Sequence, residues 1–468
     1  MGTRPPPDEF RALVDEQAQR GETWALLEQG KRFLTGDNVP KDVDRAVPLI
    51  RQAADRGDPE AHALMGSIYR EGNGVQQDNA EAVKWYRLAA EQGHVEAMVS
   101  LGWMHERGLG VSKDVESAVR YYVSAADSGL PVAQSNLGYL YLEGRGVTQN
   151  DATALHWFER AAKSDYPPAL NALAWMYERG RGVARDLSKA VHLYRKAADL
   201  GDTDSLVNLA ILAQAGTGMK TDHAQAIEWL KLAADKNNLR AQFTLGTAYL
   251  NGTGVSRDQA QARTWFQKAA DQGSSDALVQ LGLMDELGWG GPRDYKATVR
   301  RYHAAAKQGH AAGQYNLGRL SHEGKAVQRD DEIAFAWLKK AADQGLAEAE
   351  NYVGFLYQNG LGTSTNNEEA VKYFRKAADK GLSDAQNNLG LMYCYGKGVS
   401  QDYKLAFEWF QKAAKQRNAM AQGNLGVLYQ NGWGVAADRV KAIAWYLKAS
   451  DQGYELAKQN LRNLGIQP

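Results

Sequence analysis

Apolar residues recur along this chain with the spacing of amphipathic helices. In residues 241–276, Ala241, Leu245, Ala248 and Tyr249 stand at i, i+4, i+7 and i+8, which is one face of a helix of about three turns. A glycine-containing turn follows, and then a second periodic run with an aromatic pair and two alanines at 269–270. The pattern predicts two helices, A and B, joined by a tight turn.

This helix pair is one copy of a repeat. The chain repeats itself with a period of 36 residues from Ala25 to Leu456, without insertion or deletion, which makes twelve copies. A single helix pair cannot bury both of its faces, whereas stacked pairs share a continuous core. The prediction is therefore one cooperative all-α solenoid in place of several compact domains.

Two columns of the repeat mark the helix ends. One glycine recurs in all twelve copies and a second follows two residues later in ten, which indicates backbone with positive φ at the end of helix A. Asp or Asn then precedes helix B in all twelve, as expected of N-caps. Most copies end in Gly, which is replaced by Asp165, Asn237 and Arg417 in three of them. Asp and Asn are the residue types that best tolerate the left-handed conformation expected there.

The ends of the array need polar covers. Asp8 to Arg20 is predicted to form a short amphipathic helix, and Leu456 to Leu464 a final unpaired helix A. The predicted organisation is thus an N-terminal tail and capping helix at 1–24, twelve repeats at 25–456, and a C-terminal capping helix at 457–468.

The recurring string A-x-x-x-L-G-x-x-Y-x-x-G-x-G-V-x-x-D-x-x-x-A-x-x-W-[YF]-x-K-A-A-x-x-G resembles the Sel1-like repeat, a relative of the tetratricopeptide repeat. Good matches are SNLGYLYLEGRGVTQNDATALHWFERAAKS at 135–164 and NNLGLMYCYGKGVSQDYKLAFEWFQKAAKQ at 387–416. The resemblance implies a right-handed superhelix with helix A on the concave side, and a role as an adaptor between proteins. The chain departs from the cysteine-rich secreted branch of that family, because it has one cysteine.

The amino-acid composition argues against nucleic acid and membranes as partners. Lys plus Arg and Asp plus Glu both number 55, so the chain lacks the basic field that gathers nucleic acid or anionic membrane. No apolar run approaches the ~18 residues of a membrane span. The N-terminus shows no signal peptide, and a lone Cys394 fits a reducing compartment, so a cytoplasmic protein is expected, although a removed leader would leave no trace. A monomer or weak oligomer is expected.

Helix A carries a further row of side chains, which we name the Trp103 row. Its members directly follow the Leu-Gly pair and stand about 200° around the helix from the core Leu. The row consists of Trp103, Tyr139, Trp175, Ile211, Thr247, Leu283, Arg319, Phe355, Leu391 and Val427. On a concave face it would form a mostly apolar strip whose Trp and Tyr are typical interface anchors. The alternative is that these side chains pack between neighbouring helices A.

Asparagines recur two residues before the helix-A glycine or its replacement, at Asn136, Asn208, Asn316, Asn388 and Asn424. An amide offers donors and an acceptor, so this ladder would suit the backbone of an extended peptide. The competing interpretation, that the amides tie adjacent repeats together, is favoured.

Departures from the repeat are a third candidate. At 205–222, Ala210 and Ala213 replace Gly and Tyr, and at 285–326, Asp285 and Ser321 replace Tyr while Arg301 replaces Trp. The second stretch also predicts a basic patch for an acidic partner, made of Arg293, Lys296, Arg300, Arg301 and His322. A softer joint in the array and neutral drift are the alternatives.

Catalytic and cofactor motifs are missing from the sequence. No H-E-x-x-H or G-x-x-x-x-G-K-[ST] occurs, and no histidine is placed by sequence to activate Cys394, so neither a catalytic residue nor a metal or cofactor is expected. The favoured function is a non-enzymatic scaffold that binds a protein or peptide on the concave face. The alternatives are a dedicated binder of one enzyme or toxin, and a glycan or cell-wall-peptide binding protein or enzyme.

Overall fold

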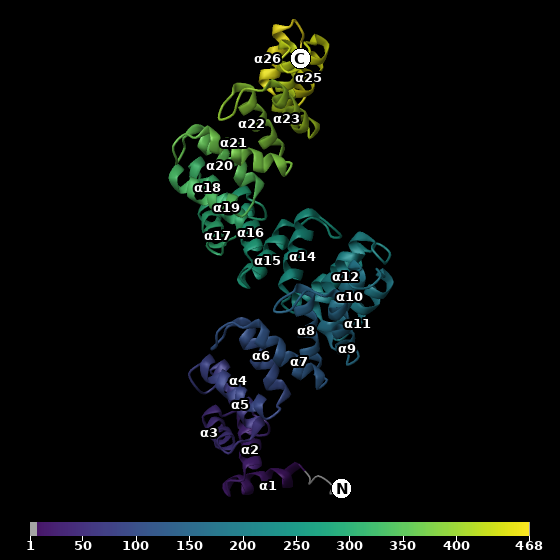
Figure 1. Ribbon diagram of the computed structural model, residues 1–468, viewed down its shortest axis with the longest axis vertical. Helices are drawn as coiled ribbons and strands as arrows, with labels where there is room; N and C mark the ends of the chain where they lie inside the picture. The colour runs from purple at the N-terminus through teal and green to yellow at the C-terminus, as the bar shows by residue number, and fades with distance from the viewer. Residues whose placement is uncertain (1–6, 468) are drawn as a thin grey trace. The chain divides into compact units, whose positions relative to one another are not determined.

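The computed structural model describes residues 7–467, and every regular element in them is an α-helix (Figure 1). The chain forms two compact units, Met1–Asn238 and Leu239–Pro468. The first holds α1 (Pro7–Gln19), α2 (Thr23–Thr35), α3 (Val43–Asp55), α4 (Pro59–Glu71), α5 (Asn79–Glu91), α6 (Val95–Arg107), α7 (Val115–Asp127), α8 (Pro131–Glu143), α9 (Asp151–Ala162), α10 (Pro167–Arg179), α11 (Leu187–Asp199), α12 (Thr203–Ala215) and α13 (His223–Asp235). The second holds α14 (Leu239–Asn251), α15 (Gln259–Asp271), α16 (Ser275–Leu287), α17 (Tyr295–Lys307), α18 (Ala311–Glu323), α19 (Asp331–Asp343), α20 (Ala347–Asn359), α21 (Asn367–Asp379), α22 (Ser383–Tyr395), α23 (Tyr403–Lys415), α24 (Ala419–Asn431), α25 (Arg439–Ser450) and α26 (Glu455–Asn463).

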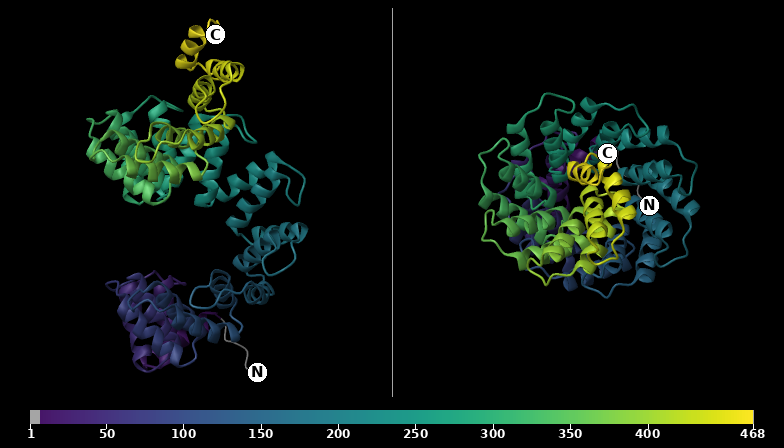
Figure 2. Two further views of the ribbon diagram at one scale, coloured as in Figure 1. Left: turned by 45° about the horizontal axis from the view of Figure 1, so that its top comes forward. Right: turned by 90° about the horizontal axis from the view of Figure 1, so that it is seen from above.

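The helices alternate as the 36-residue pattern predicts. Even-numbered helices from α2 onward are helices A and odd-numbered ones from α3 onward are helices B, and each A packs most extensively on the B that follows it. The ribbons in Figure 2 show helices and short loops throughout. The prediction of an all-α solenoid is confirmed. In the described part of the chain, no helix has the length and apolar character needed to cross a membrane.

Helices also lie near both ends of the array. The expected first helix is α1, and the expected unpaired helix A is α26. Residues 1–6 of the expected N-terminal tail, together with Pro468, lie outside the described residues.

The turn chemistry read from the sequence is confirmed. The invariant glycines, from Gly36 to Gly432, have φ between 64° and 81°. All twelve Asp or Asn residues of the N-cap column accept hydrogen bonds from the first turn of helix B, as Asp186 does from the Lys189 amide at 2.9 Å. The three substitutes for the last glycine are left-handed too, with φ of 53°, 61° and 64° at Asp165, Asn237 and Arg417.

A second glycine column sets the distance between helices A and B. The Gly of the Leu-Gly pair faces the second residue of the helix-B aromatic pair, and a Cβ on Gly138 would lie 2.5 Å from the ring of Phe158. The same approach recurs at Gly102 and Tyr122. Because a Cβ does not fit there, the glycine allows the two helix backbones to close around a fully buried ring.

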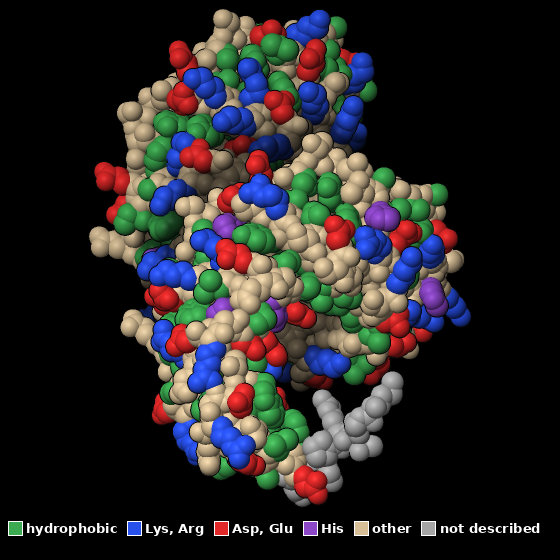
Figure 3. All heavy atoms as spheres, turned by 60° about the horizontal axis from the view of Figure 1, so that its bottom comes forward, with side chains coloured by type: hydrophobic (Ala, Val, Ile, Leu, Met, Phe, Trp, Pro, Cys, Tyr) green, Lys and Arg blue, Asp and Glu red, His purple; other side chains and the backbone are tan. Residues whose placement is uncertain are grey.

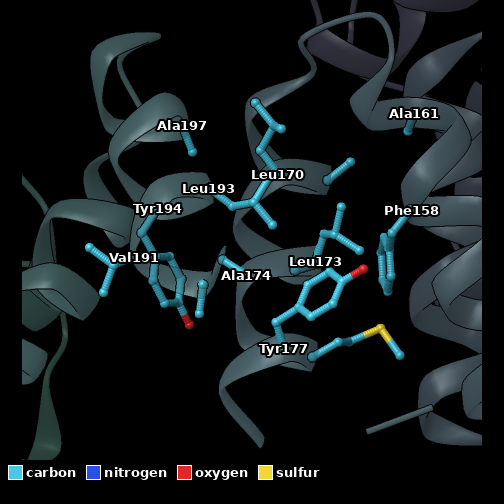
Figure 4. Packing of buried hydrophobic residues seen from close by; sticks show 14 of the residues in the cluster. Phe158, Ala161, Leu170, Leu173, Ala174, Tyr177, Val191, Leu193, Tyr194 and Ala197 are labelled. Atoms are coloured by element: carbon cyan, nitrogen blue, oxygen red, sulfur yellow. The ribbon is translucent and has the colours of Figure 1, made fainter. Parts of the chain in front are cut away.

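The core lies between the A and B layers. Phe158 and Tyr194 are 0% exposed, as are the alanines that meet them. Figure 4 shows Phe158, Leu173 and Tyr177 gathered in the space between neighbouring helices, with Tyr194 beside Ala174. Ala174 replaces the usual glycine in its repeat, so this column tolerates the smallest side chain.

Candidate interaction surfaces

The Trp103 row lies at the edge of the core. Trp103 is 37% exposed, Ile211 40% and Phe355 39%, although the Leu or Val two positions earlier in each helix is almost fully buried. The remaining members, Tyr139, Trp175, Thr247, Leu283, Arg319, Leu391 and Val427, are partly buried. None of the ten side chains belongs to the fully buried core.

In the first unit, the row combines exposed and supported aromatic rings. The Tyr139 ring meets Phe158 edge-on, with 5.0 Å between ring centroids. The Arg181 guanidinium lies 5.7 Å from the centroid of Trp175. Trp103, Tyr139 and Trp175 thus stand on successive helices A, α6, α8 and α10.

In the second unit, one row member, Phe355, meets a residue of the predicted basic patch, His322. His322 on α18 lies 6.1 Å from Phe355 on α20, between ring centroids, and 5.6 Å from Tyr352. Tyr352 also meets Phe355 at 6.0 Å and Tyr315 at 6.3 Å. The planes of these contacting pairs are inclined by 75° to 86°. We name these four rings, Tyr315, His322, Tyr352 and Phe355, the Phe355 cluster.

Arg319, the row member before Phe355, is held by carboxylates. Its guanidinium donates to both oxygens of Glu286 at 2.7 and 2.8 Å and to Glu323 at 3.0 Å. These partners raise the already high pKa of Arg319 against the opposing effect of burial. Arg319 therefore bridges α16 and α18 as an ion-paired cation.

The predicted basic patch divides into two kinds of residue. Arg293, Lys296 and Arg300 are exposed. His322 bonds with Asp331 at 2.7 Å, and Arg301 donates to Asp285 at 2.7 Å and to Gln267 at 3.0 Å. On the face drawn in Figure 3, acidic and basic side chains are interspersed.

Asp285 and Arg301, which both depart from the repeat pattern, interact with each other. Asp285 is 3% exposed and forms ion pairs with both Arg301 and Arg263. Arg263 also donates to the Trp289 carbonyl at 3.0 Å. In most other repeats, the position of Arg263 holds an aliphatic residue and the position of Asp285 holds Tyr. The position of Arg301 mostly holds an aromatic residue. One buried ion triad thus replaces an apolar contact. Arg263 was missed in the sequence, although it is the one charged residue in its column.

The asparagine ladder ties repeats together. Asn208 donates to Asn171 at 2.9 Å, and Asn388 and Asn424 donate in the same way to Asn351 and Asn387. Each bond joins neighbouring helices A. The favoured interpretation is therefore confirmed for these three residues, which use an amide donor within the array.

The described residues contain no group of three or more His, Cys, Asp or Glu placed to hold a metal ion. Cys394 is buried, and burial raises the pKa of its thiol. His105 takes the place of Tyr in helix A and stacks on Tyr121 at 5.7 Å. Burial lowers its pKa, which favours the neutral ring.

Comparison with known proteins agrees with this architecture. The Sel1 repeat matches residues 28–58, 59–94, 95–130, 131–166, 167–202, 203–238, 239–274, 275–310, 311–346, 347–382, 383–418 and 419–454. No curated protein matches the chain. Among solved structures, c5321, a protective antigen of uropathogenic Escherichia coli strains with an SLR fold, is 36% identical, with a TM-score of 0.60 over 89% of this chain and 90% of that one.

A Sel1 repeat protein from Oxalobacter formigenes is 32% identical, with a TM-score of 0.51 over 68% of this chain and 95% of that one. Proteins with these repeats generally mediate protein–protein interactions and are generally not enzymes. With twelve matched repeats across nearly all of its length, this chain belongs to the Sel1 repeat family.

Proposed function

We propose that this protein is a non-enzymatic interaction scaffold that binds a protein or peptide through the Trp103 row, on the concave face of its superhelix. The observation that carries the proposal is the exposure of Trp103, Ile211 and Phe355 at one repeat position, at 37% to 40%. Their helices are otherwise well packed: Leu101 and Met104, two positions before and one after Trp103, are 0% exposed. Loose packing therefore does not account for the exposed row.

The chemistry of the row suits a protein partner. Large aromatic side chains bury much apolar area at low entropic cost, and such residues anchor most protein interfaces. Trp103 offers an exposed indole, and Trp175 offers an indole already oriented by Arg181. A row that recurs on successive helices A can meet an extended segment or a folded partner at several points.

Site-specific photocrosslinking tests this assignment. A benzophenone amino acid is placed singly at Trp103, Ile211 or Phe355 and, as matched controls, at exposed apolar positions of helices B, Leu232 and Ile333, which are 55% and 49% exposed. After irradiation in native lysate, we expect the three row positions to share a crosslinked protein that the two controls do not capture.

The pattern of products discriminates between the functional classes. Capture of one stoichiometric partner at all three row positions would identify a dedicated binder, and several partners would identify a broader scaffold. The proposal fails if the shared partner crosslinks at the helix-B controls and not at the row. The crosslinked species is identified by mass spectrometry, and circular dichroism confirms that each variant retains its helix content.

A further inference from the structure

The Phe355 cluster presents aromatic rings at the surface of helices A in the second unit. Phe355 is 39% exposed, and its ring is inclined by 86° to Tyr352 and by 82° to His322. Because the rings of Phe355, Tyr352 and His322 are nearly perpendicular to one another in these pairs, their faces point in different directions. An aromatic face carries negative charge density and attracts a cation placed over it.

Carboxylates accompany these rings. Glu348 lies in the first turn of α20, one turn before Tyr352, and Asp384 lies in the first turn of α22. In the described part of the chain, neither carboxylate forms an ion pair with a Lys, Arg or His. Asp384 accepts one hydrogen bond, from the uncharged Asn418 amide at 2.7 Å. The negative charge on this side of the cluster is therefore not neutralised from within the array.

Burial and negatively charged side chains raise the pKa values of two tyrosines in the Phe355 cluster. Burial raises the pKa of Tyr315 most, and the negative charges of Glu348 and Asp384 raise it further. Burial likewise raises the pKa of Tyr352 to about 12, with a further contribution from Glu323. Arg319 lowers both pKa values, but it is ion-paired with Glu286 and Glu323. The other two cations near the rings are also paired, Lys325 with Glu323 and Arg329 with Asp331, which leaves Glu348 and Asp384 without a matching cation. The surroundings of the rings are thus acidic.

In the first unit, acidic residues also act on a tyrosine of the Trp103 row. Burial raises the pKa of Tyr139 on α8 to about 12, and Asp202 and Asp204 at the start of α12 are the next causes. Here too an aromatic residue of one helix A lies within the field of acidic residues that begin the helix A two repeats later. Asp204 accepts from the Asn238 amide at 2.9 Å, which again leaves its charge in place.

We propose that the Phe355 cluster, with Glu348 and Asp384, binds an arginine or lysine side chain from a basic, extended segment of the partner protein. The proposal rests on the proposed function and specifies the chemistry of its partner. The rings supply cation–π attraction, and the two carboxylates supply the opposite charge. A basic segment is the occupant that both features favour, whereas an acidic segment would meet like charge.

A defined peptide tests the chemistry without the natural partner. The probe is a fluorescein-labelled peptide of alternating glycine and arginine, and its uncharged counterpart carries citrulline at each arginine position. Fluorescence polarisation with the full chain at low salt is expected to show saturable binding of the arginine peptide. Binding is expected to weaken at least about tenfold for the citrulline peptide and to weaken steeply with added salt.

Variants locate the site. The double variant Glu348→Gln/Asp384→Asn and the single variant Phe355→Ala are each expected to raise the dissociation constant about five- to tenfold. The matched control is Glu332→Gln/Glu368→Gln, which removes two exposed carboxylates from the first turns of helices B in the same unit. Because the net charge changes equally, the control is expected to keep wild-type affinity.

The outcomes separate this inference from the proposed function. Equal loss in the control variant would show that the peptide responds to net charge alone and would overturn the inference, as would equal binding of the citrulline peptide. If the Trp103 row captures a partner by photocrosslinking while the arginine peptide does not bind, the scaffold function stands and the basic-segment inference is wrong. Thermal unfolding by circular dichroism confirms that each variant is folded.

Discussion

At the scale of single residues, left-handed backbone determines which side chains the turns accept. Ten of the twelve repeats place glycine two residues after the invariant one, and its φ lies between 66° and 78°. The two exceptions, Asn38 and Ala326, have φ of 55° and 68°. Asn tolerates this region well, whereas an Ala Cβ meets the neighbouring carbonyl oxygen, at a cost of about 1–2 kcal/mol.

Replacing Ala326 with Gly is therefore expected to stabilise the protein. The relief of the left-handed strain exceeds the added backbone entropy of glycine in the unfolded chain, for a net gain of about 0.5–1 kcal/mol. Urea unfolding followed by circular dichroism measures the change as a higher midpoint at unchanged slope.

The reverse substitution at the equivalent position provides the comparison. Gly290 has φ of 68°, and a Cβ there would lie 2.5 Å from the Gln259 carbonyl oxygen. Gly290→Ala is expected to lose at least about 1 kcal/mol. A destabilised Ala326→Gly variant would show that the turn at 324–326 has adjusted to its alanine and that the strain argument does not hold there.

At the scale of elements, the ion triad of α15, α16 and α17 replaces an apolar helix contact. Asp285 lies between Arg263 and Arg301, and all three side chains are at most 25% exposed. Removing one member of a buried ion pair leaves the other charge unpaired, which costs about 3–5 kcal/mol. Replacing the entire set with well-packed apolar residues is often neutral or stabilising.

Asp285→Asn is accordingly expected to lose about 3 kcal/mol. The triple variant Arg263→Val/Asp285→Tyr/Arg301→Trp restores residue types common in these columns and is expected to equal or exceed the wild type in stability. Denaturant unfolding of both variants measures the two changes in the free energy of unfolding. A triple variant as unstable as Asp285→Asn would mean that the local helix spacing no longer admits the aromatic pair.

At the scale of the whole molecule, stability is a sum of repeats and of the bonds between neighbours. Gln386 shows such a connection: it donates to the Ala378 carbonyl of the preceding helix B at 3.2 Å and accepts from Gln416 of its own repeat at 2.9 Å. The same pair of bonds recurs around Gln314 and Gln422. Because each repeat depends on its neighbours, a local defect is expected to spread only to nearby repeats.

Hydrogen exchange measures that spread. In Asp285→Asn, amide protection is expected to fall most in α15, α16 and α17, to fall less in the helices next to them, and to stay unchanged in α4 and α5. Uniform loss of protection across the chain would instead show that the array unfolds as a single block. The Ala326→Gly variant serves as the control, because it is expected to lower protection nowhere.

The sequence predicts the fold of this protein more completely than it predicts the candidate site. Repetition makes each structural requirement visible twelve times, so the left-handed glycines and the Asp and Asn caps were predictable from chemistry that acts within a few residues. The tyrosine hydroxyls show what was missed. Tyr122 donates to Glu106 and Tyr194 to Glu178, 16 residues earlier, whereas Phe158 has Leu142 at that distance. The sequence contains these acceptor residues 16 positions before the tyrosines. Their pairing with the tyrosine hydroxyls becomes apparent only when helix A is packed on helix B.

The sequence by itself determined the helix pair, its ends and its all-α stacking, because periodicity, caps and turns depend on local backbone physics. Only the tertiary structure decided which charges are neutralised and which aromatic rings stay exposed. Arg301 and Arg319 differ from Arg300 because side chains from other helices reach the first two. Phe355 meets His322 of the preceding helix A through a contact that no spacing within one repeat reveals. Electrostatics and exposure depend on distances between elements, and those distances are set by the packing of whole repeats.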